Sequence, residues 1–235
     1  ISIPFSYVTG SAYFWQKRRK QEKISEIEHR KATLNKEAID VTPKNGEDKY
    51  EFNYLPEEEY KEKYEYRPVT VTGVYDHNNE ILVDRTRDHE RGFWVITPLY
   101  THIDSKGKKR GIFVDRGWID DKYRYSKLHY DDSTNKKVTI MGILRDTEAT
   151  EKDAITNDFQ ENRILIIDIN EFEIAKGLKS PHEFEDKKRS CYLRETDFGQ
   201  KNKGNLYPQL PSKESFLNWY ITPERHQAYS NFWLF

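Results

Sequence analysis

The sequence predicts an α+β protein with a curled, mostly antiparallel β-sheet of barrel-like form and flanking helices. It also predicts that this domain lies between two transmembrane helices, each only partly present in the chain. The spacing of apolar residues changes from a helical to a two-residue period at Tyr66. The strand-like segments that follow are joined by short connections, which favour antiparallel neighbours. Both ends of the chain are uncharged and aromatic.

The composition limits the classes of function. Hydrophobic residues make up only 35% of the chain, so the aromatic residues, at 14%, must supply much of the core. The 39 basic and 40 acidic side chains give a net charge of −1 and no general attraction for nucleic acid. Cys191 is the single cysteine, which excludes an intrachain disulfide and a multi-thiolate zinc site.

The two ends of the chain suggest membrane helices. No charge occurs before the basic run QKRRKQEK, and a membrane-spanning helix needs about 20 apolar residues. Residues 1–14 are therefore predicted to be the end of a first span, stopped by basic residues at the lipid surface. The uncharged AYSNFWLF predicts that residues 223–235 begin a second span. The alternative is that both ends pack on a soluble core, and the presence of one at each end favours the membrane.

The segment after the first span divides into two parts. Residues 15–39 lack Gly and Pro and carry one sparse apolar stripe, which predicts a charged, membrane-proximal helix. Residues 40–65 are acidic, rich in tyrosine and interrupted by Pro43, Gly46 and Pro56. They are predicted to form a linker or insertion without a regular core strand.

Residues 66–222 are predicted to form the membrane-external α+β domain. Its strand candidates are RPVTVTGVYD, EILVDR, GFWVITPLYT, GIFVDRGWID and KKVTIMGILRD. The first and last share a Val-Thr repeat, in which Gly73 and Gly142 would allow a bend. RILIIDI, residues 163–169, is a further candidate for a buried strand, and it leads into a short helix closed by Gly177.

Arg116 lies at the apolar end of its predicted strand. With a two-residue period it shares a face with Val114 and Trp118, unless a bulge at Gly117 changes the phase. A charge placed there needs acceptors and an aromatic face to stack on, such as Trp118 or Trp94. Gly117 would let another backbone come close. Arg116 either locks the end of the strand or contacts a partner or ligand.

The sequence contains no motif of an enzyme active site. G-x-G-x-x-G, G-x-x-x-x-G-K, G-x-S-x-G and H-E-x-x-H are all missing from it, and its carboxylates and histidines are not clustered. We therefore expect no enzyme and no catalytic residues.

An ordered set of segments resembles the Surfeit-locus protein 1 family. The set is YRPVTVTGVYDH, GFWVITPL and VDRGW, joined by the Trp15-Gln16 region, ENRILIIDINEFEIA and HQAYSNFW. The resemblance covers nearly the whole chain, with insertions near 40–62, 120–136 and 179–220. It includes our candidates for structural or partner contact, which are Arg67, Gly73, Arg116, Gly117 and Trp118.

The resemblance implies an assembly factor for haem–copper cytochrome c oxidase, respiratory complex IV. Such a protein acts as a chaperone that assists insertion of haem a into the large catalytic subunit, and its partners are oxidase subunits and the membrane. The expected location is the mitochondrial inner membrane, with the globular domain facing the intermembrane space. A transiently bound haem a is the only cofactor implied, and haem iron the only metal.

The resemblance places His226 at the family's membrane-entrance histidine, with Ser230 in place of the usual alanine. The other six histidines lie in the charged domain, whereas His226 opens an aromatic segment. Tyr229 and Trp233 follow at helical spacings and would offer rings on the same face. His226, Tyr229 and Trp233 are therefore the haem-binding candidates. The alternative is a histidine in an interfacial aromatic belt, without a ligand.

Two functions of different class follow. The first is a chaperone that receives haem a and transfers it to the nascent oxidase. The second is a permanently bound structural subunit of the mature oxidase or respiratory supercomplex, for which the insertions would supply docking surface. A soluble, aromatic-rich ligand-binding barrel is a third.

Overall fold

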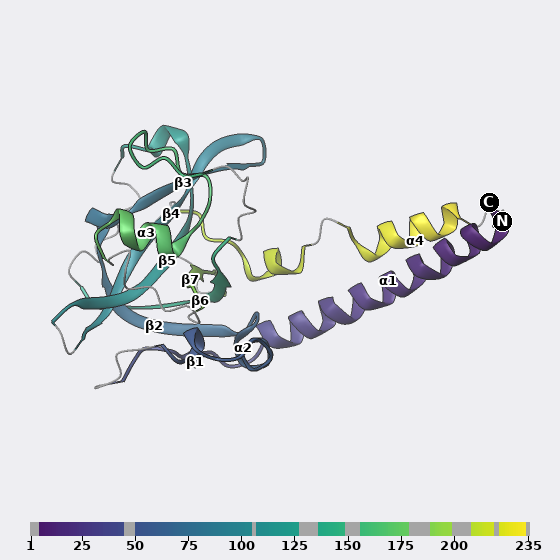
Figure 1. Cartoon of the computed structure of the whole chain (residues 1–235), viewed down its shortest axis with the longest axis horizontal. Helices are drawn as coiled ribbons and strands as arrows, with labels where there is room; N and C mark the ends of the chain where they lie inside the picture. The colour runs from purple at the N-terminus through teal and green to yellow at the C-terminus, as the bar shows by residue number, and fades with distance from the viewer. Residues whose placement is uncertain are drawn as a thin grey trace. The chain divides into compact units, whose positions relative to one another are not determined.

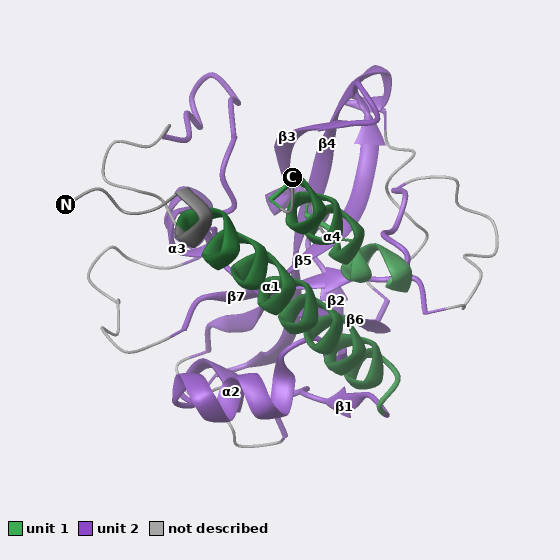
Figure 2. Ribbon diagram, turned by 90° about the vertical axis from the view of Figure 1, so that its right-hand side faces the viewer, with its two compact units in different colours: residues 1–36, 213–235 green, residues 37–212 purple. Residues whose placement is uncertain are grey.

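The structure is a computed structural model of the 235-residue chain. It describes residues 5–44, 50–104, 107–126, 136–148, 156–178, 189–198, 208–218 and 221–233. The chain forms two compact units, shown in different colours in Figure 2. The helical unit consists of Ile1–Lys36 and Lys213–Phe235, and the barrel unit of Glu37–Ser212.

The helical unit is built on α1 (Phe5–Leu34) and α4 (Pro223–Phe232), which run side by side in Figure 1. Thr222 caps α4 by accepting a hydrogen bond from a first-turn backbone N–H, and Pro223 has the fixed φ that suits a helix start. A 3₁₀ helix, Lys213–Leu217, contacts α1 through the hydrogen bond from Arg30 Nη1 to the carbonyl of Phe216, 2.9 Å long.

Helix α1 is continuous across the predicted boundary between segments 1–14 and 15–39, and the chain enters a strand at Ile39. Among the described residues, no helix combines the length and the apolar composition that a membrane crossing requires.

The described residues of the barrel unit form seven strands in one mixed sheet: β1 (Ile39–Asp40), β2 (Pro68–Tyr75), β3 (Ile81–Arg87), β4 (Glu90–Ile103), β5 (Lys109–Asp120), β6 (Val138–Asp146) and β7 (Cys191–Glu195). The order is β1-β2-β6-β7-β5-β4-β3, and an additional β2–β4 pairing closes β2, β6, β7, β5 and β4 into a barrel. Pairs β1–β2 and β5–β7 are parallel, and the other pairs are antiparallel. The predicted α+β class with a curled, mostly antiparallel sheet is confirmed.

The two Val-Thr repeats pair with each other. In the β2–β6 ladder Val69 lies opposite Gly142 and Gly73 lies opposite Val138. A Cβ atom at Gly73 would lie 2.5 Å from the carbonyl oxygen of Tyr100 on β4, and one at Gly142 would meet a carbonyl oxygen of β7 at 2.3 Å. Each glycine therefore lies where a third backbone comes close, and this is how the sheet curls.

The core of the barrel unit takes part of its aromatic content from segment 40–65. This segment contains the 3₁₀ helix Glu51–Asn53 and α2 (Glu57–Tyr64). Its buried aromatic residues share one cluster with the barrel valines and leucines: Tyr50, Phe52, Tyr60, Tyr64, Val69, Val71, Leu99, Val114 and Leu193. The segment predicted as a linker thus contributes to the core, and aromatic residues fill much of it, as the composition predicts.

The prediction of a strand at 163–169 is wrong, although Ile164, Ile167 and Ile169 are buried. The segment makes an isolated bridge at Arg163 and no further strand pairing. Side chains replace the missing neighbour strand, because Asn157 Oδ1 accepts from the N–H groups of Leu165 and Ile166, and Glu148 Oε2 accepts from that of Ile167. These acceptors satisfy backbone groups that burial would otherwise leave unpaired.

The helix predicted after this segment is α3 (Ile169–Ala175). Asp168 caps its start, and Gly177 follows its end with a φ of 66°. Its buried Phe172 packs edge-on against Phe113 of β5, with the ring centroids 6.0 Å apart. A second core cluster forms between this helix and the sheet.

Candidate functional site

Arg116 is buried in β5 at a β-bulge. Its exposure is 4%, and one residue of β4, Val95, lies opposite both Arg116 and Gly117. Gly117 has a φ of 109°, which L side chains rarely adopt. The bulge that the sequence left open is therefore present, and it directs the guanidinium into the interior.

Partners surround Arg116 on several sides. Its Nη1 lies 3.5 Å from Glu80 Oε2 and 3.3 Å from His77 Nδ1, and its guanidinium carbon lies 4.7 Å from the centre of the Tyr75 ring. Glu80 Oε2 also accepts a 2.8 Å hydrogen bond from Thr97 Oγ1. Acceptors and an aromatic face are both present, as the burial of a charge requires. This geometry favours an arginine that locks the strand end over one that contacts a ligand.

The ring beside Arg116 differs from the two that the sequence suggested. The guanidinium groups of Arg85 and Arg194 lie over the Trp94 ring, with their central carbons 4.6 and 4.0 Å from its centre. The guanidinium carbon of Arg87 lies 5.9 Å from the centre of the Trp118 ring. A two-residue period cannot identify which ring a bulged residue meets, because the bulge changes the phase.

Gly117 allows the close approach of a second backbone that the sequence predicts. Trp118 donates to the carbonyl of Gln209 at 3.0 Å, and Gln209 donates back at 2.8 Å. A Cβ atom at Gly117 would lie 2.5 Å from the same carbonyl oxygen. Of the other candidates, Arg67 donates from Nε to the carbonyl of Glu37 at 3.2 Å, away from this bulge.

His226 belongs to α4 and is buried where this helix packs against α1, with an exposure of 6%. Its Nδ1 lies 2.8 Å from the side-chain oxygen of Gln16 on α1. An amide oxygen can only accept, so Nδ1 carries the proton and neutral His226 keeps its lone pair on Nε2. Gln16 thereby fixes the tautomer and the ring orientation. No pattern in the sequence indicates this role of Gln16.

Burial lowers the pKa of His226 below its ordinary value, and the nearby charges of Arg19 and Lys23 lower it further. His226 is therefore neutral at pH 7, which is the form of an imidazole that binds a metal.

An open hollow of about 370 Å³ lies beside His226. Its lining residues are Trp15, Arg18, Arg19, Glu22, Lys23, Ile221 and His226. The indole ring of the hollow belongs to Trp15 of α1, a residue that was not among the predicted haem-binding residues. The hollow combines an imidazole, an indole ring and cationic side chains.

The structure places Tyr229 and Trp233 outside the lining of this hollow. Tyr229 is 48% exposed, and Trp233 packs edge-on against Phe232 with the ring centroids 5.4 Å apart. The residue that shares the buried side of α4 with His226 is Ser230, which is fully buried. Spacing on one helix alone could not show this, because α1 decides which side of α4 is covered.

Residues 8–235 match the model of the SURF1 family. The chain belongs to the SURF1 family. This agrees with the resemblance found in the sequence. The matched range includes the bulge at Arg116 and the hollow at His226.

Three curated relatives are similar to this SURF1-family chain. Surfeit locus protein 1 of Arabidopsis thaliana is 34% identical over 116 residues, or 47% of this chain and 30% of the relative. Cytochrome oxidase assembly protein SHY1 of Saccharomyces cerevisiae is 37% identical over 62 residues, which cover 26% of this chain and 15% of the relative. Surfeit locus protein 1 of Gallus gallus is 28% identical over 166 residues, which cover 63% of this chain and 48% of the relative. The aligned regions thus span less than half the length of each relative.

The depressed pKa of His226 makes the stability of this SURF1-family chain depend on pH. Unfolding restores the ordinary pKa of about 6.5, so the unfolded state binds the proton more readily. Stability is therefore complete above about pH 6.5 and falls as the pH is lowered through that value. We expect His226→Gln to remove this part of the pH dependence in denaturation curves between about pH 5 and 8.

His29→Gln provides the matched control, because it removes an exposed histidine from α1. Equal pH dependence of stability in wild type and His226→Gln would contradict the assignment.

Proposed function

We propose that the chain is an assembly factor for haem–copper cytochrome c oxidase and that it acts in mitochondria. Membership of the SURF1 family supports this, together with a relative whose name is Cytochrome oxidase assembly protein. The proposed task is to assist insertion of haem a into the large catalytic subunit of the oxidase. The proposed partners are therefore oxidase subunits, and no substrate is turned over.

The observation that carries the haem proposal is the state of His226. A neutral imidazole with Nδ1 bound to Gln16 has its lone pair on Nε2, and His226 would hold haem iron through that atom. The donor set fits the group, because Trp15 supplies an aromatic face and Arg18 and Arg19 supply cations for propionate carboxylates. Bound haem would supply a redox-active iron centre. A hollow of about 370 Å³ would hold one edge of the macrocycle.

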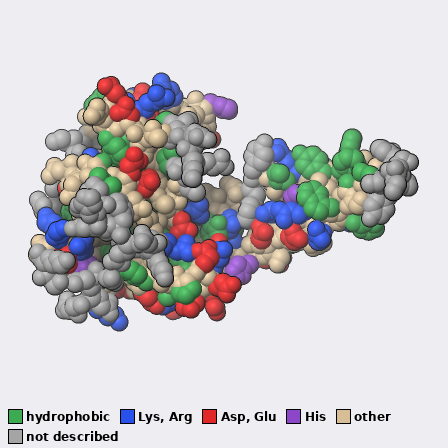
Figure 3. All heavy atoms as spheres, in the orientation of Figure 1, with side chains coloured by type: hydrophobic (Ala, Val, Ile, Leu, Met, Phe, Trp, Pro, Cys, Tyr) green, Lys and Arg blue, Asp and Glu red, His purple; other side chains and the backbone are tan. Residues whose placement is uncertain are grey.

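We propose that the protein works at the mitochondrial inner membrane, on the intermembrane-space side. Large apolar side chains of the helical unit are exposed, among them Phe14 at 69% and Phe232 at 71%. In Figure 3, apolar side chains gather on the part of this unit that lies nearest the chain termini, next to charged ones. Such a surface suits contact with a membrane or with an apolar partner.

A second candidate is a permanently bound structural subunit of the oxidase. The insertion near 179–220 supports it, because Gln209 anchors that insertion to β5 through two backbone hydrogen bonds. This segment also contains the barrel strand β7, so the residues around Gln209, outside that strand, would offer the surface for lasting contact with another subunit.

Haem binding can be tested on the full-length protein, purified from cells that make haem a. We expect the wild type to show a haem absorption band and His226→Ala to lose most of it. Gln16→Ala should weaken binding by about tenfold, since partners that orient a metal-binding histidine typically contribute 10–100-fold. His29→Ala is the control. Equal haem content in wild type and His226→Ala would refute ligation by His226.

Native electrophoresis with mass spectrometry distinguishes the two candidate functions. An assembly factor should appear in amounts below one per complex and in oxidase intermediates. A resident subunit should appear at one copy in each mature oxidase.

A further inference from the structure

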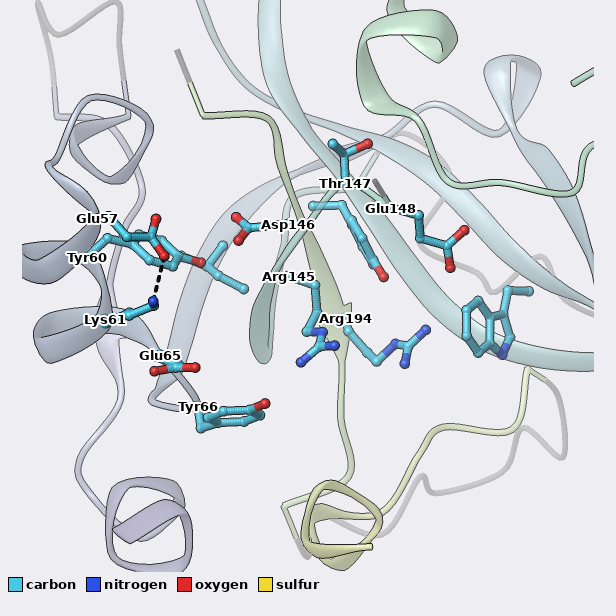
Figure 4. A pocket seen from close by; sticks show the side chains of 13 residues that line it. Glu57, Tyr60, Lys61, Glu65, Tyr66, Arg145, Asp146, Thr147, Glu148 and Arg194 are labelled. Atoms are coloured by element: carbon cyan, nitrogen blue, oxygen red, sulfur yellow. Dashed lines mark ion pairs between the residues drawn. The ribbon is translucent and has the colours of Figure 1, made fainter. Parts of the chain in front are cut away.

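The barrel unit contains a second hollow, of about 350 Å³, on the outer side of β6 and β7 (Figure 4). Arg145 of β6 lies opposite Tyr192 of β7, so Arg145 is the diagonal neighbour of Arg194 on the same face of the sheet. Figure 4 shows these two arginine side chains beside each other, with Tyr66 nearby. Two guanidinium groups therefore line one hollow, from strands far apart in the sequence.

The acidic residues of the lining are largely engaged by other cations. Asp146 accepts two hydrogen bonds from Arg189, at 2.9 and 2.8 Å. Glu148 accepts two from Arg85, at 2.6 and 2.7 Å. These carboxylates are thus neutralised by arginines that do not line the hollow.

A further acid of the lining, Glu57, forms ion pairs with Lys61, at 2.9 Å, and with Arg189. Glu65 also lines the hollow, and it is exposed to solvent. Of the lining carboxylates, Glu65 is the one for which the described residues show no close ion pair.

Arg194 is anchored but incompletely bonded. Its Nε donates to Asp115 Oδ2 at 2.7 Å, and its guanidinium stacks on Trp94. Its Nη2 is buried and has no hydrogen-bond partner among the residues that the structure describes, while the side chain as a whole is 17% exposed. A buried donor left without an acceptor is unfavourable, so the described residues leave part of the hydrogen-bonding capacity of Arg194 unused.

Arg145, unlike Arg194, has no carboxylate partner among the described residues. Its guanidinium carbon lies 5.9 Å from the centre of the Tyr66 ring, and within the described part of the chain it makes no ion pair. Like charges on neighbouring strands repel each other, and an anion between them removes the repulsion. Tyr66 itself has a φ of 54°, a strained conformation for a bulky residue and one that often occurs at binding sites.

We propose that this hollow binds the phosphate or carboxylate group of a small molecule that has an aromatic or apolar body. Arg145 and Arg194 would hold the oxyanion, because guanidinium forks match the geometry of carboxylates and phosphates. The rings of Trp94 and Tyr66 line the same hollow and would contact the body of the ligand. The volume of about 350 Å³ suits a small molecule. The site is separate from the hollow at His226 and does not depend on haem binding.

The test uses phenyl phosphate as the probe, with calorimetric titration of the full chain at physiological ionic strength. We expect Arg145→Gln to weaken binding by about tenfold or more, since a hydrogen bond to a charged group contributes at least that factor. Glu65→Gln should strengthen binding, because it removes a negative charge from the lining. Arg91→Gln, at an exposed arginine of β4, is the matched control and should bind like the wild type.

A second variant tests whether weaker binding could result from loss of folding. Arg194→Lys keeps the charge near Asp115 but removes the Nη2 donor, and it should weaken binding at an unfolding midpoint close to that of the wild type. The proposal is overturned if millimolar phenyl phosphate gives no heat of binding, or if Arg145→Gln binds as the wild type does. It is also overturned if inorganic phosphate binds as tightly as phenyl phosphate, because the rings would then contribute nothing.

Discussion

Replacing Arg116 with alanine should lower the free energy of unfolding by about 2–4 kcal/mol. The side chains of Arg116 and Glu80 are only 4% and 7% exposed, so removal of the guanidinium leaves the Glu80 carboxylate in the interior without its cationic neighbour. The Tyr75 ring also loses the cation stacked on it. Chemical denaturation of the full chain measures the change.

Two comparisons make this result specific. Arg91→Ala removes an exposed arginine from the adjacent strand β4 and should change the free energy by no more than about 0.5 kcal/mol. Replacing Arg116 by Met together with Glu80 by Gln removes both charges and should cost less than Arg116→Ala alone. If Arg116→Ala and Arg91→Ala had equal effects, Arg116 would not be a locking residue, and a contact with a partner would become the better explanation.

Gly117→Ala should destabilise the barrel unit by about 3 kcal/mol or more, for two reasons that add. A φ of 109° is strained for alanine, at about 1–3 kcal/mol. The new Cβ would also lie 2.5 Å from the carbonyl oxygen of Gln209, and this contact is with backbone, which cannot turn away. The clash should separate Gln209 from β5, so the amide hydrogens of Trp118 and Gln209 should exchange faster.

Gly107 separates the two contributions. It also has a positive φ, 77°, but a Cβ atom there would meet nothing within 4 Å. Gly107→Ala should therefore cost only about 1 kcal/mol, from backbone strain alone. Equal losses for the two substitutions, measured by the same denaturation, would show that the approach of Gln209 does not require a glycine at residue 117.

The strands and their buried faces could be predicted because they depend on residues that are close in sequence. Val69 and Val71 alternate with threonines, and both are fully buried in β2. The short helix α3 begins at a capping Asp168 and is followed by Gly177, as local rules require. The need of Arg116 for acceptors also follows from its position in an apolar strand, because a buried charge requires them wherever it lies.

The arrangement of distant segments was decided only by the tertiary structure. The barrel closes where Val74 of β2 pairs with Tyr100 of β4, and β7 adds to β5 in parallel. Neither pairing has a local signal, because a strand pattern shows which face is buried and not which strand lies beside it. The irregular segment 163–169 is another case, since side chains of Glu148 and Asn157 accept hydrogen bonds from its backbone N–H groups.

In the two hollows, too, local sequence predicted some features and only the tertiary structure decided the others. The sequence alone singled out His226, because it opens an uncharged aromatic segment, but the packing of α1 on α4 decided that Gln16 and Trp15 accompany it. Arg145 and Arg194 carry no motif and lie on different strands, and only the β6–β7 register brings them to one face. Residue type and local spacing determine which side chains need partners, whereas long-range packing determines which partners they meet, because contacts between distant segments form only when the whole chain folds.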